Sequence, residues 1–422
     1  MNTITIDKFS VQIYNCGDYV AQNTQVVRSN IVYRNMKDPS FLKYYYKFQT
    51  LEKVTGNQVY GSSPPDVFVG RFGYPNVFIG PLVPPELGDT SIMGIPEMWV
   101  GKSMEEIVRF RSNLVRGMYR TKIGNADNGR IEEMIAELAM ADKYSGVEEV
   151  LKHKPVLGMH FDENAQPYGP SAKMTDMKID NSRANPVVEK AYSDTDLKAK
   201  DAIIELYEKG VMVSRIQKSL SAGILGLGKN RKFVPTRWSI TAVDDTLSKN
   251  KLKRVKEYES LDRIDVYENV ALDNRWLVIM LPGSWEYELV EAWYPNTTWN
   301  TDSPDIEIFS SYEPFKGRTK YAEIGGCYYA ARLASAELLD KTQKQGKVVI
   351  LREAHSGYIM PVGVWNVREH VREALRGKPV QLSSYEELFK FVRSRMDIPI
   401  ETWIKNSTLL SVSLRQRRLA VA

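Results

Sequence analysis

A glycine-rich turn followed by cations is the first part of this chain whose residue types and spacing suit phosphate chemistry. The turn at residues 223–228 precedes Lys229, Arg231 and Lys232, and Arg237 follows shortly after. Flexible backbone amides next to several cations can bind phosphate groups. We therefore expect a phosphate or nucleic-acid contact here, and a solvated basic loop is the alternative.

The same turn has the Gly-x₄-Gly-Lys spacing of a nucleotide-binding P-loop. A P-loop also needs Ser or Thr after its Lys to bind Mg²⁺, and it must lie between a strand and a helix. Asn230 replaces that hydroxyl, residues 213–220 have helical spacing, and Pro235 is expected to prevent a long helix from following. The sequence thus argues against nucleotide hydrolysis by a P-loop.

Paired carboxylates are the second candidate chemistry, because two acids can hold Mg²⁺ for reactions at a phosphodiester. Asp244 and Asp245 follow Arg237 closely, and Glu288 is a candidate third ligand. Each group of acids also has a structural alternative. Asp194 and Asp196, another acid pair, are placed to cap a helix, and Glu288 fits the solvent-exposed face of a strand. The acids are therefore compatible both with a metal-dependent enzyme and with a protein without catalytic activity.

Histidine and cysteine offer little catalytic chemistry. The four histidines show no metal-ligand spacing, and the two cysteines, Cys16 and Cys327, cannot form a zinc module on their own. We expect no metal site built on these residues. Residues 325–332, which end in Arg332, place small residues at the start of a helix, where amide groups can accept a phosphate or pack closely.

Local patterns predict the elements that position these residues. Ser103 and Ser384 each begin a capping box, Ser-x-x-Glu, which marks the start of a helix. We expect residues 1–55 to be an extension, partly β, and residues 151–192, which contain four prolines, to be a long loop. Further helices are predicted at 130–144, from 194 to Gly210, after Gly210 to about 221, at 327–344 and at 364–376. Strands are predicted in the region 61–81 and at 264–271, 275–281, 286–293 and 347–352. The predicted class is α+β, with mixed sheet elements and flanking helices.

Composition excludes several classes of protein. The chain has 422 residues, of which 43% are hydrophobic and 26% charged, values that fit a globular protein and not a disordered or fibrous one. It lacks the pattern of a signal peptide and any apolar stretch that could span a bilayer. We expect a cytoplasmic protein with no membrane partner. The net charge of +5 permits contact with a polyanion without requiring it.

The C-terminal tail is basic, because no acid follows Glu401 while Lys405, Arg415, Arg417 and Arg418 do. Such a tail can dock on a partner or on phosphates.

Several segments, in order along the chain, resemble the archaeal Nre family of DNA repair proteins. They cover roughly residues 56–420 and include 61–75, 112–117, 169–172, 193–199, 231–245, 288–293, 328–333 and 361–369. The resemblance implies an extension at 1–55, an N-terminal family region at 56–303 and a C-terminal family region at 304–422. It also implies a cytoplasmic protein of the DNA-damage response.

Two features of many relatives are incomplete in this chain. Cys16 stands alone, so we expect no zinc knuckle. Gln416 and Leu419 match the start of the family's clamp-binding peptide, but the aromatic pair that would anchor it is missing. We therefore expect binding to the sliding clamp to be weak or lost.

Three hypotheses follow from the sequence. The first is a repair protein that binds DNA through its cations, which are Arg71, Lys229, Arg231, Lys232, Arg237 and Arg332. The second is a metal-dependent enzyme acting on nucleic acid or nucleotides, with Mg²⁺ held by Asp244, Asp245 and Glu288. The third is a repair adaptor without catalytic activity that docks on the sliding clamp through Gln416 and Leu419.

Overall fold

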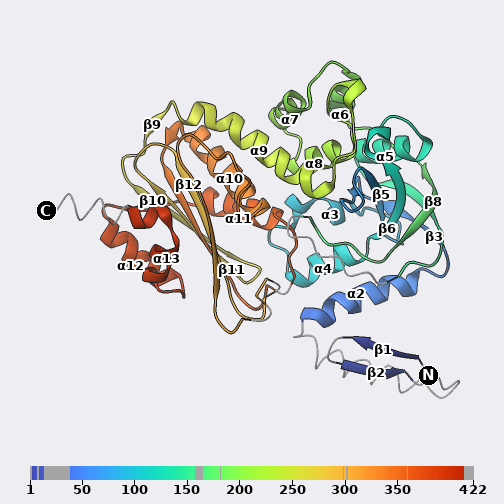
Figure 1. Cartoon of the computed structure of the whole chain (residues 1–422), viewed down its shortest axis with the longest axis horizontal. Helices are drawn as coiled ribbons and strands as arrows, with labels where there is room; N and C mark the ends of the chain where they lie inside the picture. The colour runs from blue at the N-terminus through green and yellow to red at the C-terminus, as the bar shows by residue number, and fades with distance from the viewer. Residues whose placement is uncertain are drawn as a thin grey trace.

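The computed structural model describes residues 2–6, 9–13, 39–156, 165–180, 182–297, 299–300, 303–358 and 360–412. Figure 1 shows two sheets with helices beside each, and the long helix α9 (Thr236–Val255) passing from one half of the molecule to the other. The predicted α+β class is confirmed. Within the described residues, no helix combines the length and the apolar character needed to cross a bilayer.

The first sheet has six strands in the order β3-β7-β8-β6-β5-β4. Strands β6 and β8 pair in parallel, and the other neighbours are antiparallel. A Cβ on Gly80 would lie 1.8 Å from the Gly117 carbonyl oxygen, so β5 and β6 cross where only glycine fits. The strands are β3 (Gln58–Ser63), β4 (Val67–Val69), β5 (Asn76–Val83), β6 (Val115–Lys122), β7 (Ser145–Leu151) and β8 (Ser171–Asp180).

Helices around this sheet complete the first half of the molecule. Ile135 of α5 and Ile216 of α8 are fully buried in the same core as Val77 and Ile79 of the sheet. Helix α2 (Pro39–Lys53) packs against α4. The other helices are α3 (Ser91–Gly94), α4 (Met104–Ser112), α5 (Arg130–Met140), α6 (Pro186–Ser193), α7 (Ala199–Glu208) and α8 (Val213–Ser221).

The second sheet has the order β13-β12-β15-β11-β10-β16. Its parallel pair is β12 and β15, which are joined through β13 and α10. Because β12 precedes residue 303 and β13 follows it, the boundary expected at 303–304 falls between two paired strands of this sheet. The strands are β10 (Ile264–Ala271), β11 (Asn274–Leu281), β12 (Glu286–Trp293), β13 (Glu307–Glu313), β15 (Lys347–Ala354) and β16 (Val380–Leu382), and the short β9 (Glu259–Ser260) and β14 (Lys344–Gln345) pair separately.

Helices cover both faces of the second sheet. Alternate residues of β12 point to opposite faces, so Tyr287 and Leu289 pack with α10 (Gly326–Thr342), α11 (Trp365–Arg376) and α9. Val290 and Ala292 pack on the other face with α12 (Tyr385–Arg395) and α13 (Ile400–Asn406). Figure 1 shows α12 and α13 on the side of this sheet away from the first half.

The expected long loop at 151–192 is wrong. Pro170 directly precedes β8, and Pro186 is the first residue of α6, after the cap residue Asn185. Proline suits both places, because neither requires its missing N–H group. These two prolines therefore mark the starts of β8 and α6, whereas Pro155 and Pro167 lie in irregular backbone.

Three other local predictions also differ from the structure. Asp194 ends α6 and does not cap α7, which begins after Lys198 without a side-chain cap. Pro235 does not prevent a long helix, since α9 starts directly after it. The extension holds the β1–β2 hairpin (Asn2–Ile6 and Phe9–Ile13) and also α2, whose buried positions Tyr46, Lys47 and Thr50 mix polar and apolar residues and so hide the helical period.

Candidate functional site

Four exposed aromatic rings lie together where the two halves of the molecule meet. The turn between β4 and β5 carries Phe72 and Tyr74, the first turn of α9 carries Trp238, and the segment before α10 carries Tyr321. Their exposed fractions are 75%, 51%, 45% and 55%. We call these four residues the aromatic patch.

One ring contact and one shared hollow join three members of the aromatic patch, and Phe72 lies on the same turn as Tyr74. The ring centroids of Tyr74 and Trp238 are 5.3 Å apart, and those of Tyr321 and Tyr329 are also 5.3 Å apart. Trp238 and Tyr321 line the same hollow of about 430 Å³, together with Arg237 and Asp245. Gly73 has a φ of +84°, so the turn that presents Phe72 and Tyr74 requires glycine.

Cations surround the aromatic patch. The Arg71 guanidinium lies 5.2 Å from the centre of the Phe72 ring, and Arg237 lines the hollow. The Ile123 N–H donates to the Pro75 carbonyl at 3.0 Å, and the Phe233 N–H donates to the Ile123 carbonyl at 2.9 Å. These bonds hold the backbone next to Lys122 and Lys232, whose side chains are exposed, near the same turn. The patch thus combines stacking surfaces with positive charge.

The other predicted cations have different surroundings. Lys229 is exposed on a short 3₁₀ turn, Gly228–Asn230. Arg231 is buried, because its guanidinium donates to the carbonyls of Gly226 and Tyr192 and lies 4.4 Å from the centre of the Tyr192 ring. It holds the glycine-rich turn against α6.

Arg332 is also buried. Its guanidinium donates to Glu313 at 2.5 Å and pairs with Asp245, and it lies between α9 and α10. These carboxylates explain why the pKa of Arg332 is raised despite its burial. Its donors are directed to these two carboxylates and to the Ser248 hydroxyl.

The structure does not bring the three predicted acids together. Asp244 is fully buried and accepts hydrogen bonds from Arg368 at 3.1 and 3.2 Å, and burial raises its pKa to about 6 although Arg368 lowers it. Glu288 lies on the opposite face of the second sheet, where it accepts hydrogen bonds from Ser407 at 2.6 Å and from the amides of residues 408 and 409. Asp245 alone of the three lines the hollow.

A second cavity, of about 290 Å³, lies at the carboxyl ends of the parallel strands β12 and β15. We call it the strand-end cavity. Such a place is a common binding site, because helices begin there and leave room between them. Its lining residues are Glu291, Trp293, Trp299, Phe309, Glu323, Ile324, Cys327, Arg352, Tyr358, Pro361, Gly363 and Val367.

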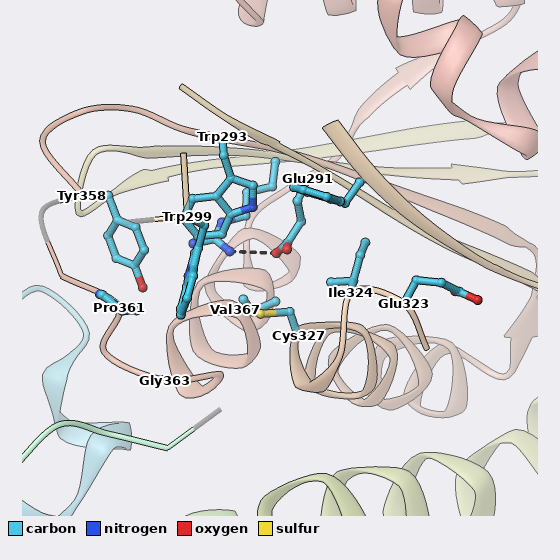
Figure 2. A pocket seen from close by; sticks show the side chains of 12 residues that line it. Glu291, Trp293, Trp299, Glu323, Ile324, Cys327, Tyr358, Pro361, Gly363 and Val367 are labelled. Carbon is cyan, nitrogen blue, oxygen red and sulfur yellow. Dashed lines mark hydrogen bonds and ion pairs between the residues drawn. The ribbon is translucent and has the colours of Figure 1, made fainter. Parts of the chain in front are cut away.

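A buried ion pair lies in the wall of the strand-end cavity. Arg352 Nη1 donates to Glu291 Oε1 at 2.7 Å, and Arg352 Nε donates to the Asn274 side chain at 2.8 Å. The guanidinium also lies 4.6 Å from the centre of the Trp276 ring and 4.7 Å from that of Trp293. Figure 2 shows the Glu291 carboxylate beside the Trp299 ring, with Cys327 and Val367 below. The Glu291 carboxylate compensates the charge of Arg352, which raises the pKa of Arg352.

The helix start predicted near Gly325 is confirmed, because α10 begins at Gly326. The strand-end cavity has no such local signal, because Glu291 and Arg352 are neighbours only through the parallel pairing of β12 with β15. The aromatic residues Trp293 and Trp299, near the end of a predicted strand, were the one available signal.

His355 belongs to a polar group that the sequence did not indicate. Ligand atoms of Glu353, His355 and Asp397 lie within 4.8 Å of one another. The Glu353 carboxylate already accepts the N–H group of Ile398 at 2.8 Å, and Asp397 pairs with Arg275 at 2.5 Å. These contacts join the end of β15 to the segment after α12. The clamp-peptide residues Gln416 and Leu419 lie outside the described residues, so clamp binding stays a prediction.

Comparison with known proteins relates most of the chain to one family. Residues 37–300 match the model of the archaeal Nre N-terminal region, and residues 313–421 match that of the archaeal Nre C-terminal region. The chain is 43% identical to DNA repair protein NreB of Archaeoglobus fulgidus over 86% of this chain and 91% of the relative. It is 35% identical to DNA repair protein NreA of Haloferax volcanii over 85% and 88%. No solved structure matches.

Proposed function

Because the chain belongs to the archaeal Nre family, we propose that it acts in DNA repair and binds single-stranded or unpaired DNA through the aromatic patch. The observation that carries this proposal is the group of four exposed rings, Phe72, Tyr74, Trp238 and Tyr321. Bases stack on exposed aromatic side chains when they are not stacked on one another, and each stack contributes about 1–3 kcal/mol. A group of exposed rings therefore favours an unpaired strand over a closed duplex.

The surrounding cations suit the backbone of such a strand. Arg71, Lys122 and Lys232 are exposed, and Arg237 is half-buried beside Trp238. Contacts to phosphates release counterions, so affinity should fall as salt rises. Of the cations predicted from sequence, Arg71, Lys232 and Arg237 are assigned to this surface. Arg231 and Arg332 are buried and bind other parts of the protein.

Binding of a fluorescent single-stranded oligonucleotide across a salt series tests the proposal. Replacing Trp238 with Ala should weaken binding about 5- to 150-fold at constant salt, because one stacking surface is lost. Replacing Arg71 with Ala should weaken binding and reduce the slope of log affinity against log salt by about 0.7, the value for one phosphate contact on a single strand.

Two variants are matched controls. Tyr60, on β3, is 52% exposed and lies outside the aromatic patch, so Tyr60→Ala should leave DNA binding unchanged. Arg376 is exposed at the end of α11 and serves in the same way for charge. Equal affinity of Trp238→Ala and the unmodified protein, or affinity that does not depend on salt, would contradict the proposal.

A further inference from the structure

We propose that the strand-end cavity binds a single nucleobase that carries an exocyclic amino group. The base is supplied either by an unpaired nucleotide of DNA or by a free nucleotide. This inference does not depend on the aromatic patch, which shares no residue with the cavity.

The shape of the cavity favours a flat ring. Figure 2 shows the Trp299 ring on one side and Ile324 on the other, with the Glu291 carboxylate between them and Cys327 and Val367 below. An aromatic face opposite an aliphatic side chain forms a slot for a planar group, which gains stacking energy on the aromatic side. The volume of about 290 Å³ is at the lower end for small-molecule sites.

The charges of the cavity favour a neutral base with a donor. Arg352 compensates Glu291 across a distance of 2.7 Å, and both side chains are almost completely buried. The pair therefore attracts neither a free cation nor a free anion strongly. The Glu291 carboxylate is an acceptor in the wall, so it can accept a hydrogen bond from an amino group on the edge of a base. Adenine, cytosine and guanine have such a group, whereas thymine lacks it.

Cys327 provides a direct probe of this site. Its partly exposed thiol lines the cavity, and Cys16 is the other cysteine of the chain. Iodoacetamide alkylates an accessible thiol, and mass spectrometry reports the rate at each cysteine separately. With dAMP at about ten times its Kd, the rate at Cys327 should fall about tenfold, because about one tenth of the protein is then unoccupied. Thymidine monophosphate should protect Cys327 less at the same concentration.

Variants separate base binding from a general effect on the thiol. Trp299→Ala should raise the dAMP concentration needed for half-maximal protection about 5- to 150-fold, and Trp299→Phe should raise it much less, since a stacking face remains. Trp238→Ala, in the aromatic patch, should leave protection by dAMP unchanged. The two tryptophan variants thus distinguish failure of this inference from failure of the proposed function.

A comparison of DNA substrates identifies the source of the base. Protection by a duplex with one looped-out adenine, but not by the fully paired duplex, assigns an extruded nucleotide, and protection by dAMP alone assigns a free nucleotide. The inference is overturned if neither ligand slows alkylation of Cys327, or if Trp299→Ala is protected as well as the unmodified protein.

Discussion

Arg231 and Arg237 are six residues apart and have different surroundings. The Arg231 guanidinium is held by the Gly226 and Tyr192 carbonyls, whereas Arg237 lines the hollow beside Trp238. Both are cations next to a glycine-rich turn in the sequence. Contacts with α6, about forty residues earlier in the chain, bury the first, whereas the second lies beside the exposed ring of Trp238.

His370 shows how burial changes a titrating side chain. It lies in α11, and burial together with the nearby charge of Arg352 lowers its pKa from 6.5 to about 4. The unfolded chain therefore binds a proton between pH 6.5 and 4 that the folded protein does not bind. The stability linked to this residue is present above pH 6.5 and is lost as the pH falls toward 4.

We expect the free energy of unfolding to fall by about 3 kcal/mol through His370 alone over this range. Urea denaturation of the unmodified protein and of His370→Gln at several pH values measures this contribution as the difference between the two slopes. Other groups titrate in both proteins and cancel. Parallel pH profiles for the two proteins would show that His370 is protonated in the folded state.

The N-cap residue Ser103 stabilises the start of helix α4. Ser103 accepts a hydrogen bond from the Glu106 N–H at 3.2 Å, and the Glu106 side chain accepts one from the Ser103 N–H at 2.9 Å. The predicted capping box is thus confirmed. The helix carries Arg111, which pairs with Asp66 at 2.7 Å inside the first half of the molecule.

Ser103→Ala should lower the free energy of unfolding by about 1 kcal/mol, because the Glu106 amide loses its partner. Thermal or urea unfolding measures this loss. Ser103→Asp keeps an acceptor at the same place and is expected to change stability by less than about 0.5 kcal/mol. A loss as large in Ser103→Asp as in Ser103→Ala would mean that the serine contributes by some means other than capping.

In the second sheet, local sequence predicts the strands themselves, but not their order. Alternating hydrophobic residues predicted β10 and β12 with the bounds that the structure shows. No local pattern reveals that β15 inserts between β11 and β12. That order creates the parallel strand ends at which the strand-end cavity lies, so the cavity could not be predicted from the elements alone.

At the scale of the whole molecule, buried charges join segments that are distant in the chain. Arg368 of α11 donates to Asp244 of α9 at 3.1 and 3.2 Å and lies 3.9 Å from Glu97. The Asp244 carboxylate also accepts a hydrogen bond from Gln217 of α8 at 3.1 Å. These contacts connect the first half of the molecule with the helices on the second sheet.

We expect Arg368→Met to cost about 3–5 kcal/mol, because a buried carboxylate loses its cation. Combining it with Asp244→Leu should cost less than the sum of the two single changes by about 1 kcal/mol or more, since the charges depend on each other. Denaturation at pH 8, where Asp244 is ionised, measures all three variants. Additive losses would contradict a direct coupling.

The exposed pair Arg393 and Glu401 is the matched control for this cycle. Its atoms are 2.6 Å apart, but both side chains are more than half exposed. Solvent screens such a pair, so Arg393→Ala should cost less than about 1 kcal/mol.

The sequence by itself determined the α+β class, the caps at Ser103 and Ser384, most helices and central strands, and membership of the Nre family. These features depend on hydrogen bonds and side-chain periods within a few residues, or on matches along the chain. The tertiary structure decided that Asp244 and Glu288 lie on opposite sides of one sheet, that Arg231 is buried, and that exposed aromatic residues from three distant segments lie near one another. Burial and proximity between remote segments arise only when the sheets and helices pack, because each side chain's surroundings then come from other parts of the chain.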